Sequence, residues 1–439
     1  MKSEGKKIIQ NIFWLMFDKI FILLLQFFIG IKVANHYGAT LFGKYSYAIS
    51  IIAFSNIFFE LINGRIIKKY YTDKNFDEIV YNINFFKNTI SLVIFIVLII
   101  LNFIYKFDKI LFMLLIFLSL DNILITATSG IENFFEFKLE ARRIVISNNI
   151  VKLISYTIQY FGIIFNQDIV FIAIVSCFGS FLRLLIIKYQ YKYTYLNNIG
   201  IIKEKIKLEL LKKMINESKY LWLTFISFLV YTQTDKIMIK YYLGLRELGI
   251  YTIGMQLSSV LAILIVPIQN SLFPKFLKLY REDYKKYYNF YLISNTIITQ
   301  IYLMITFISI LVVNYSFKYI YSKEYTGAII IYSILAFSIL FKANGSLQSS
   351  HMTIKNITKK SFYKTLLSLV VNIILNMILI PKLGINGAAI ATLVTQFIAL
   401  FLIDFFIEEY REQAIIQLKS FNTIYFFKNF KRILKEKGR

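Results

Sequence analysis

The sequence predicts an all-α polytopic membrane protein with about twelve transmembrane helices. Of its 439 residues, 57% are hydrophobic and only 17% are charged, whereas an average soluble domain has about 25% charged residues. The mean hydropathy of the chain is +0.61. Its apolar residues gather in runs of about 20, which is the length of helix that crosses the hydrocarbon core of a bilayer. These observations exclude a water-soluble globular protein.

Each predicted span is an apolar run between more polar loops. The division between the fifth and sixth runs depends on the tripeptide 166–168, whose Asn-Gln-Asp sequence is typical of a tight turn. The predicted spans are 11–34, 44–66, 83–105, 109–129, 145–165, 168–188, 219–241, 249–273, 288–313, 326–347, 362–380 and 385–407.

The distribution of basic residues predicts the orientation of the chain. With these spans, 35 of the 50 Lys and Arg residues lie on one side and seven on the other. Because cytoplasmic loops are rich in Lys and Arg, this asymmetry places both termini in the cytoplasm. The net charge of +25 is then a consequence of membrane topology, and without a nucleic-acid-binding motif it predicts no nucleic-acid partner.

Cysteine and histidine are too scarce for two further classes of protein. The single cysteine, Cys177, cannot form an internal disulfide bond. The two histidines, His36 and His351, have no cysteine partners with the spacing of a zinc site. We therefore predict neither a metal site nor a cofactor.

The chain is predicted to consist of two halves of six spans each. Residues 1–200 form the N-terminal lobe and 219–407 the C-terminal lobe. Between them, 201–218 is a cytoplasmic linker with amphipathic helical periodicity, which suits the membrane surface. Residues 408–439 are predicted to form a basic cytoplasmic tail.

A short segment repeats in the two halves. The segment from Gly38 to Ser46, Gly-Ala-Thr-Leu-Phe-Gly-Lys-Tyr-Ser, reappears from Gly244 to Thr252 as Gly-Leu-Arg-Glu-Leu-Gly-Ile-Tyr-Thr. Both copies lie between the first and second spans of their half, where glycine favours a tight turn. Short loops of any membrane protein can have such a composition, but the equivalent positions favour a parallel internal repeat. Such repeats are typical of transporters with a site between two lobes.

Several motifs together resemble one family. They are Asn11-Ile-Phe-Trp14, His36-Tyr-Gly38, Tyr231 to Asp235-Lys236, Gly249-Ile-Tyr251 and Leu383-Gly384-Ile-Asn-Gly387. With them the chain resembles the polysaccharide biosynthesis flippases (Wzx type, O-antigen repeat-unit exporters) of the multidrug/oligosaccharidyl-lipid/polysaccharide (MOP) exporter superfamily. The resemblance covers nearly the whole chain.

This resemblance implies a MATE-like, V-shaped pair of six-helix lobes related by a pseudo-two-fold axis along the membrane normal. It also implies a function in the bacterial cytoplasmic (inner) membrane, where the protein would move undecaprenyl-pyrophosphate-linked oligosaccharide to the outer leaflet by alternating access. Membrane lipids and the polysaccharide polymerase or assembly machinery are the implied partners. Related lipid II flippases have two further spans, whereas 408–439 contains no run long enough to cross.

Ionisable residues inside the spans are the candidate site residues, because burying a charge in a bilayer is costly unless it faces a cavity or a partner. The predicted cationic residues would attract the pyrophosphate, and the carboxylates would couple transport to a proton or sodium gradient. The alternative is that these residues form interhelical ion pairs that fix packing. The cationic candidates are Lys19, Arg65, Lys152, Arg183, Lys236 and Lys342, and the carboxylate candidates are Asp18, Glu60, Asp121 and Asp235.

Five charged residues near span ends have a simpler interpretation. Long side chains at such positions can extend to the membrane surface while their stems stay in the apolar layer. The residues expected to do so are Lys32, Lys87, Arg183, Lys240 and Asp404.

Two other functions remain open. A MATE-type drug or cation antiporter would favour carboxylates. Apart from the residues assigned to the loops on either side, however, the spans contain eight Lys or Arg and five Asp or Glu, which favours an anionic cargo. A membrane-embedded polysaccharide polymerase or ligase would need a catalytic constellation or a large loop domain, and we find neither. We therefore predict a transporter without catalytic residues.

Overall fold

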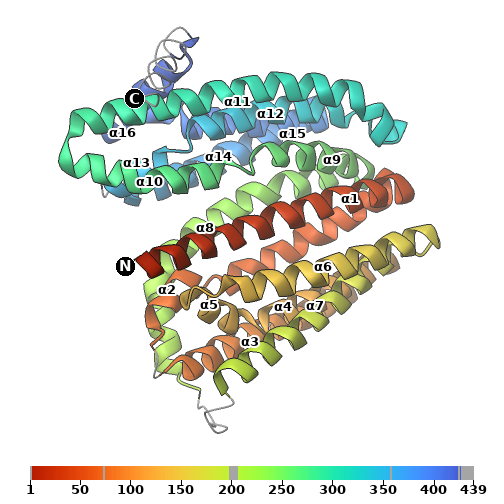
Figure 1. The fold of residues 1–439 in the computed structure, drawn as a ribbon. Helices are drawn as coiled ribbons and strands as arrows, with labels where there is room; N and C mark the ends of the chain where they lie inside the picture. The colour runs from red at the N-terminus through yellow and green to blue at the C-terminus, as the bar shows by residue number, and fades with distance from the viewer. Residues whose placement is uncertain (1, 73–74, 197–205, 356–357, 424–425, 427–439) are drawn as a thin grey trace. The chain divides into compact units, whose positions relative to one another are not determined.

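The computed structural model describes residues 2–72, 75–196, 206–355, 358–423 and 426 (Figure 1). Within these ranges the chain consists of helices joined by short turns and contains no β-strand. It divides into two compact units, Met1–Leu229 and Val230–Arg439. The predicted all-α class is confirmed.

The first helix, α1 (Lys2–Phe59), contains the first predicted span and most of the second. Gly38 inside it has φ +73° and ψ 171°, which is not a helical conformation. The chain therefore breaks there into two helical arms, red and orange in Figure 1. Gly244, its equivalent in the repeat, has φ +92° and ψ −177° between α8 and α9. A side chain with a Cβ would be strained at both points, so the predicted glycine turns are confirmed.

The rest of the N-terminal unit packs α6 against α1 and α7, and α4 against α7. A cluster of aromatic side chains fixes the short helix α5, in which Phe134 stacks on Phe76 with ring centres 4.7 Å apart. The elements are α2 (Gly64–Tyr70), α3 (Phe76–Tyr105), α4 (Lys109–Thr126), α5 (Ser129–Phe137), α6 (Ala141–Ile164), α7 (Ile169–Tyr191) and a π-helical turn (Lys192–Leu196).

The boundary between the units falls inside α8 (Leu208–Leu243). In the C-terminal unit α12 packs against α9 and α15, and α14 packs against α15. Its elements are α9 (Leu245–Leu261), α10 (Ile265–Glu282), α11 (Tyr284–Ile320), η2 (Lys323–Tyr325), α12 (Ala328–Asn344), α13 (Gln348–Ile354), α14 (Thr358–Leu383), α15 (Ile385–Leu400), η3 (Leu402–Phe405) and α16 (Glu408–Ser420).

The predicted span 249–273 is not one continuous helix. It is divided between α9 and α10, with a break at residues 262–264. Pro267 lies in the first turn of α10, where the missing N–H of proline removes no helical hydrogen bond. Pro274, by contrast, lies in the interior of α10, where its nitrogen has no hydrogen to donate to the preceding turn.

Nine helical segments of the described chain are long and apolar enough to cross a membrane. One of them contains both arms of α1, which are two predicted spans. The predicted spans 145–165 and 219–241 correspond to α6 and α8, which carry more charged and amide side chains. The protein is therefore a multi-pass membrane protein in which α6 and α8 are less apolar than the other spans.

Parts of the predicted linker and of the predicted tail belong to helices that pack in the two units. From Leu208 onward the predicted linker is part of α8, whereas 201–205 lie outside the described residues. From Glu408 the predicted tail forms α16, which packs on α11. Asn344 donates a hydrogen bond to Ser420 Oγ at 2.7 Å, and Gln300 donates one to the backbone carbonyl of Ser420 at 3.0 Å. The remainder of the tail, 427–439, is also outside the described residues.

Candidate functional site

A buried carboxylate, Asp235, lies among four helices of the C-terminal unit. Its side chain on α8 is only 6% exposed. Oδ2 accepts hydrogen bonds from the hydroxyls of Tyr251 on α9 at 2.9 Å and Thr392 on α15 at 2.6 Å. Oδ1 accepts one from the amide of Asn376 on α14 at 2.6 Å. The chain thus brings four distant segments together around one carboxylate.

The surroundings of Asp235 are rich in oxygen atoms. Asn376 also donates to Asn372 Oδ1 at 3.1 Å, and its own Oδ1 is buried without a hydrogen-bond partner among the described residues. Among the described residues, no cationic side chain forms an ion pair with Asp235. Carboxylate, amide and hydroxyl oxygens are the ligands that hard cations prefer. The arrangement can therefore hold either a proton or a small cation.

Lys236 follows Asp235 on α8 and is buried as well, with 8% exposure. Successive residues of a helix point about 100° apart, so the two side chains leave the helix in different directions. Lys236 is therefore a buried cation beside the Asp235 carboxylate. On the same helix, the Tyr231 hydroxyl accepts a hydrogen bond from Gln396 at 2.7 Å.

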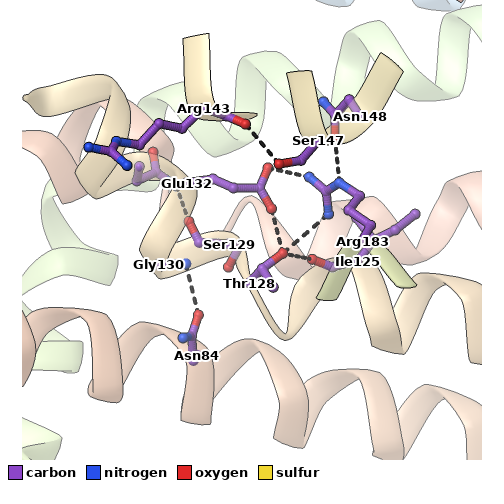
Figure 2. Close-up of polar contacts among 11 residues, drawn as sticks. Asn84, Ile125, Thr128, Ser129, Gly130, Glu132, Arg143, Ser147, Asn148 and Arg183 are labelled. Carbon is purple, nitrogen blue, oxygen red and sulfur yellow. Dashed lines mark hydrogen bonds and ion pairs between the residues drawn. The ribbon is translucent and has the colours of Figure 1, made fainter. Parts of the chain in front are cut away.

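A second polar cluster surrounds Arg183 on α7 in the N-terminal unit (Figure 2). The guanidinium forms an ion pair with Glu132 on α5 at 2.7 Å and donates to the Thr128 hydroxyl at 3.2 Å. Its Nε donates to the side chain of Asn148 on α6. Thr128 in turn donates to Glu132, so the four side chains form a closed network. Arg183 is only 8% exposed. The expectation that it extends to the membrane surface is therefore wrong.

The predicted carboxylates of this unit lie near the same network. Asp18 on the first arm of α1 lies within electrostatic range of Arg183, and its Oδ1 is buried without a hydrogen-bond partner among the described residues. Asp121 on α4 lies within electrostatic range of Lys152 and Arg183, and its Oδ1 also has no hydrogen-bond partner among the described residues. Glu60 accepts a hydrogen bond from Asn63 at 2.7 Å. The three carboxylates therefore lie near cationic side chains, but among the described residues no ion pair joins them to Arg183.

Lys87 on α3 is buried close to the same group of residues. It is 7% exposed and lies within electrostatic range of Glu60 and Glu132. It was expected to extend to the membrane surface, and that expectation is wrong. Glu132 was not predicted as a site residue because it follows the predicted span 109–129, and no signal in the sequence places α5 back against α7.

The other three predicted cations are more accessible. Lys19 on α1, Arg65 on α2 and Lys342 on α12 all have exposed side chains. The structure therefore separates the predicted cationic residues into exposed ones and ones that belong to buried networks. Which of them contact a cargo stays a prediction.

Asp404 takes part in a third buried cluster, although it was expected to extend to the membrane surface. It forms an ion pair with Lys364 on α14, and their side chains are 0% and 6% exposed. Gln348 on α13 donates to Asp404 and accepts a hydrogen bond from Lys364 at 3.1 Å. The ammonium of Lys364 also lies 5.0 Å from the centre of the Tyr410 ring of α16. This cluster joins α13, α14, η3 and α16.

Arg183→Gln is expected to lower the free energy of unfolding by about 2–3 kcal/mol, because it leaves the partly buried Glu132 carboxylate without its cation. Thermal unfolding of the purified protein in detergent measures the effect. Lys188→Gln is the matched control, since it removes an exposed cation from the same helix and is expected to change little. Equal stability of the two variants would contradict a structural role for the network.

Comparison with known proteins supplies the family. The family model described as "Polysaccharide biosynthesis protein" matches residues 8–280, which is more than half of the chain. The chain belongs to the polysaccharide biosynthesis protein family. This confirms the resemblance that the sequence motifs indicate.

Two relatives of this polysaccharide biosynthesis family member are uncharacterized membrane proteins of Methanocaldococcus jannaschii. The first is 26% identical over 267 residues, which cover 57% of this chain and 51% of the relative. The second is 44% identical over 87 residues, which cover 20% of this chain and 19% of that relative. The matched region thus spans about half of the first relative's own length.

The fold of this family member is similar to the folds of several solved membrane transporters. The lipid II flippase MurJ in an inward closed conformation has a TM-score of 0.71 with 16% identity, covering 97% of this chain and 93% of that one. An inward-facing multidrug resistance MATE family transporter of the MOP superfamily has a TM-score of 0.70 with 13% identity, covering 91% and 96%. A MOP superfamily transporter from Pyrococcus furiosus has a TM-score of 0.61 with 13% identity, covering 95% and 96%. The predicted MATE-like fold is confirmed.

Proposed function

We propose that this protein is a flippase that moves lipid-linked oligosaccharide repeat units from the cytoplasmic to the outer leaflet of a bacterial inner membrane. The observation that carries the proposal is the match to the polysaccharide biosynthesis family over residues 8–280. The likeness of its fold to the lipid II flippase MurJ supports a lipid-linked cargo. The distribution of Lys and Arg supports a cytoplasmic position for both termini.

We further propose that Asp235 couples transport to a proton or sodium gradient. Its buried carboxylate, the unpartnered Oδ1 of Asn376 and the hydroxyl of Thr392 offer several oxygen ligands from three helices. A charge inside a membrane protein is costly and marks a functional site by default. Asp18, Glu60 and Asp121 are secondary candidates, because they lie near cationic side chains of the Arg183 network.

The exposed cations are the proposed contacts for the pyrophosphate of the cargo. Lys19, Arg65 and Lys342 have accessible side chains, and a Lys or Arg side chain binds phosphate through charge-assisted hydrogen bonds. Arg183 is a weaker candidate, because Glu132 already neutralises it. Polysaccharide polymerase and other assembly proteins are the proposed partners.

Expression in a strain that lacks its repeat-unit flippase tests the function. We expect lipid-linked oligosaccharide to leave the cytoplasmic leaflet and surface polysaccharide to be restored, as measured by leaflet-selective labelling and by polysaccharide analysis. The strain with an empty vector is the control. Unchanged polysaccharide would contradict the proposal.

A drug or cation antiporter is the second candidate function, and the equally good fit to a multidrug resistance MATE transporter supports it. The same strain distinguishes the two. Altered resistance to cationic drugs without restored polysaccharide would assign the protein to that function.

A further inference from the structure

A buried lysine, Lys236, follows Asp235 on α8 and has no role in the proposed transport steps. It is 8% exposed, and it forms no hydrogen bond or ion pair with any other described residue. Its ammonium lies within electrostatic range of Asp235, because the two Cα atoms are only about 3.8 Å apart. A buried cation is costly in a membrane protein, so Lys236 is a candidate functional residue.

The Asp235 site contains a single carboxylate. The site consists of Asp235, Tyr251, Asn376 and Thr392. The sequences of α14 and α15 contain no Asp or Glu. On α9, Glu247 is paired with Arg246 at 3.1 Å, and on α8 the preceding acid, Glu217, lies about five helical turns earlier. Among the described residues, no group of three or more Asp, Glu, His or Cys side chains is placed to hold a metal ion.

One oxygen of this site is left for a ligand. Asn376 is 0% exposed, and its Oδ1 has no hydrogen-bond partner among the described residues. Asn372, one turn earlier on α14, is also 0% exposed and accepts a hydrogen bond from the Asn376 amide at 3.1 Å. Because buried acceptors in native proteins nearly always have a partner, Oδ1 of Asn376 indicates a ligand that an oxygen atom can bind.

The charge of Lys236 affects which cation can bind there. Asp235 and Lys236 together carry no net charge, so a bound monovalent cation leaves one unbalanced positive charge and a divalent cation leaves two. The repulsion from Lys236 is proportional to the charge of the ion, and it is strong where water is excluded. Calcium sites usually offset the charge of the ion with several carboxylates, whereas the Asp235 site has one.

We propose that Lys236 restricts the Asp235 site to monovalent cations, the proton included. The proposal rests on the proposed coupling role of Asp235 and adds the residue that selects the ion. Lys236 acts through its charge and does not bind the ion, because an ammonium group has no acceptor atom. Removing this charge therefore tightens the binding of every cation, and that of divalent cations most.

Cation binding to the purified full chain tests this role. Isothermal titration calorimetry with sodium chloride and with calcium chloride, at constant pH and ionic strength, measures the two dissociation constants. In Lys236→Met we expect the dissociation constant for sodium to fall about tenfold, the order of repulsion between two nearby unit charges in a protein. For calcium we expect a fall of about a hundredfold, because doubling the charge of the ion squares the factor. Lys236→Arg keeps the charge and should keep the wild-type ratio of the two constants.

Lys318→Met is the matched control, because it removes an exposed cation of the same unit from α11, which contributes no side chain to the site. Equal factors for sodium and calcium in Lys236→Met, or two unchanged constants, would overturn the role of Lys236. If the wild-type protein binds neither ion, calcium binding should appear in Lys236→Met, and its absence there would also overturn this role.

A failure of the coupling role of Asp235 gives a different result. Cation binding that persists unchanged in Asp235→Asn would place the ion elsewhere and contradict that role, whatever the effect of Lys236→Met. The elution of each variant in size-exclusion chromatography without added cation confirms that it is folded.

Discussion

Lys364→Met is expected to lower the free energy of unfolding by about 3–5 kcal/mol, the cost typical of breaking a buried ion pair by removing one partner. The reason is that Asp404, whose side chain is 0% exposed, would keep its charge without a cation. Gln348 would remain as a neutral hydrogen-bond donor but cannot balance the charge. Thermal or denaturant unfolding of the purified protein in detergent measures the loss.

The double variant Lys364→Met/Asp404→Leu is expected to recover most of this stability, since it removes both charges and keeps a similar number of side-chain heavy atoms. The surface pair of Lys278 and Glu282 provides a matched control. Its side chains are 73% and 57% exposed, so Lys278→Met is expected to change stability by less than about 1 kcal/mol. A double variant as unstable as Lys364→Met would show that the pair is needed for more than charge balance.

Asp235→Asn is expected to weaken the dependence of transport on an ion gradient by about 10- to 100-fold, the effect of losing one charged interaction. Asparagine keeps an oxygen that can accept from the hydroxyls of Tyr251 and Thr392. The fold should therefore survive while the negative charge that holds a cation or proton is lost. Transport in proteoliposomes under a sodium gradient and, separately, under a proton gradient gives the measurement and identifies the ion.

The control for Asp235 is Asp168→Asn. Asp168 is exposed and makes no side-chain hydrogen bond to the start of α7, so its replacement should leave gradient dependence unchanged. Wild-type transport with unchanged gradient dependence in Asp235→Asn would exclude this residue from coupling. An unfolded variant would be recognised by its elution in size-exclusion chromatography, and Thr392→Val then tests the same carboxylate through a neighbouring ligand.

The positions of the helices follow from patterns that are local in the sequence. Apolar runs of about 20 residues predict the spans, because a helix of that length is what a bilayer accommodates. Gly38 and Gly244 predict the turns that begin the second helix of each half, and both have positive φ angles. The apolar run continues through the break between α9 and α10, so hydropathy alone predicts a single span there. Hydropathy reports the length of an apolar run but not whether its backbone is continuous.

The partners of the charged residues could not be predicted in this way. Asp404, Arg183 and Lys87 were expected to extend to the membrane surface, since each lies near the end of an apolar run. In the structure their side chains are buried, and Asp404 and Arg183 form ion pairs with Lys364 and Glu132. These partners are separated by tens of residues and come from different helices. Their meeting depends on how each helix is rotated and at what depth it lies.

The sequence by itself determined the all-α membrane class, the approximate spans, the glycine turns of the repeat and the resemblance to the polysaccharide biosynthesis family. Each of these depends on composition or on short motifs, which tertiary packing does not alter. Only the tertiary structure decided that Asp235 is held by Tyr251, Asn376 and Thr392. Four helices have to pack in one particular register to bring those side chains together, and no local pattern of residues specifies that register.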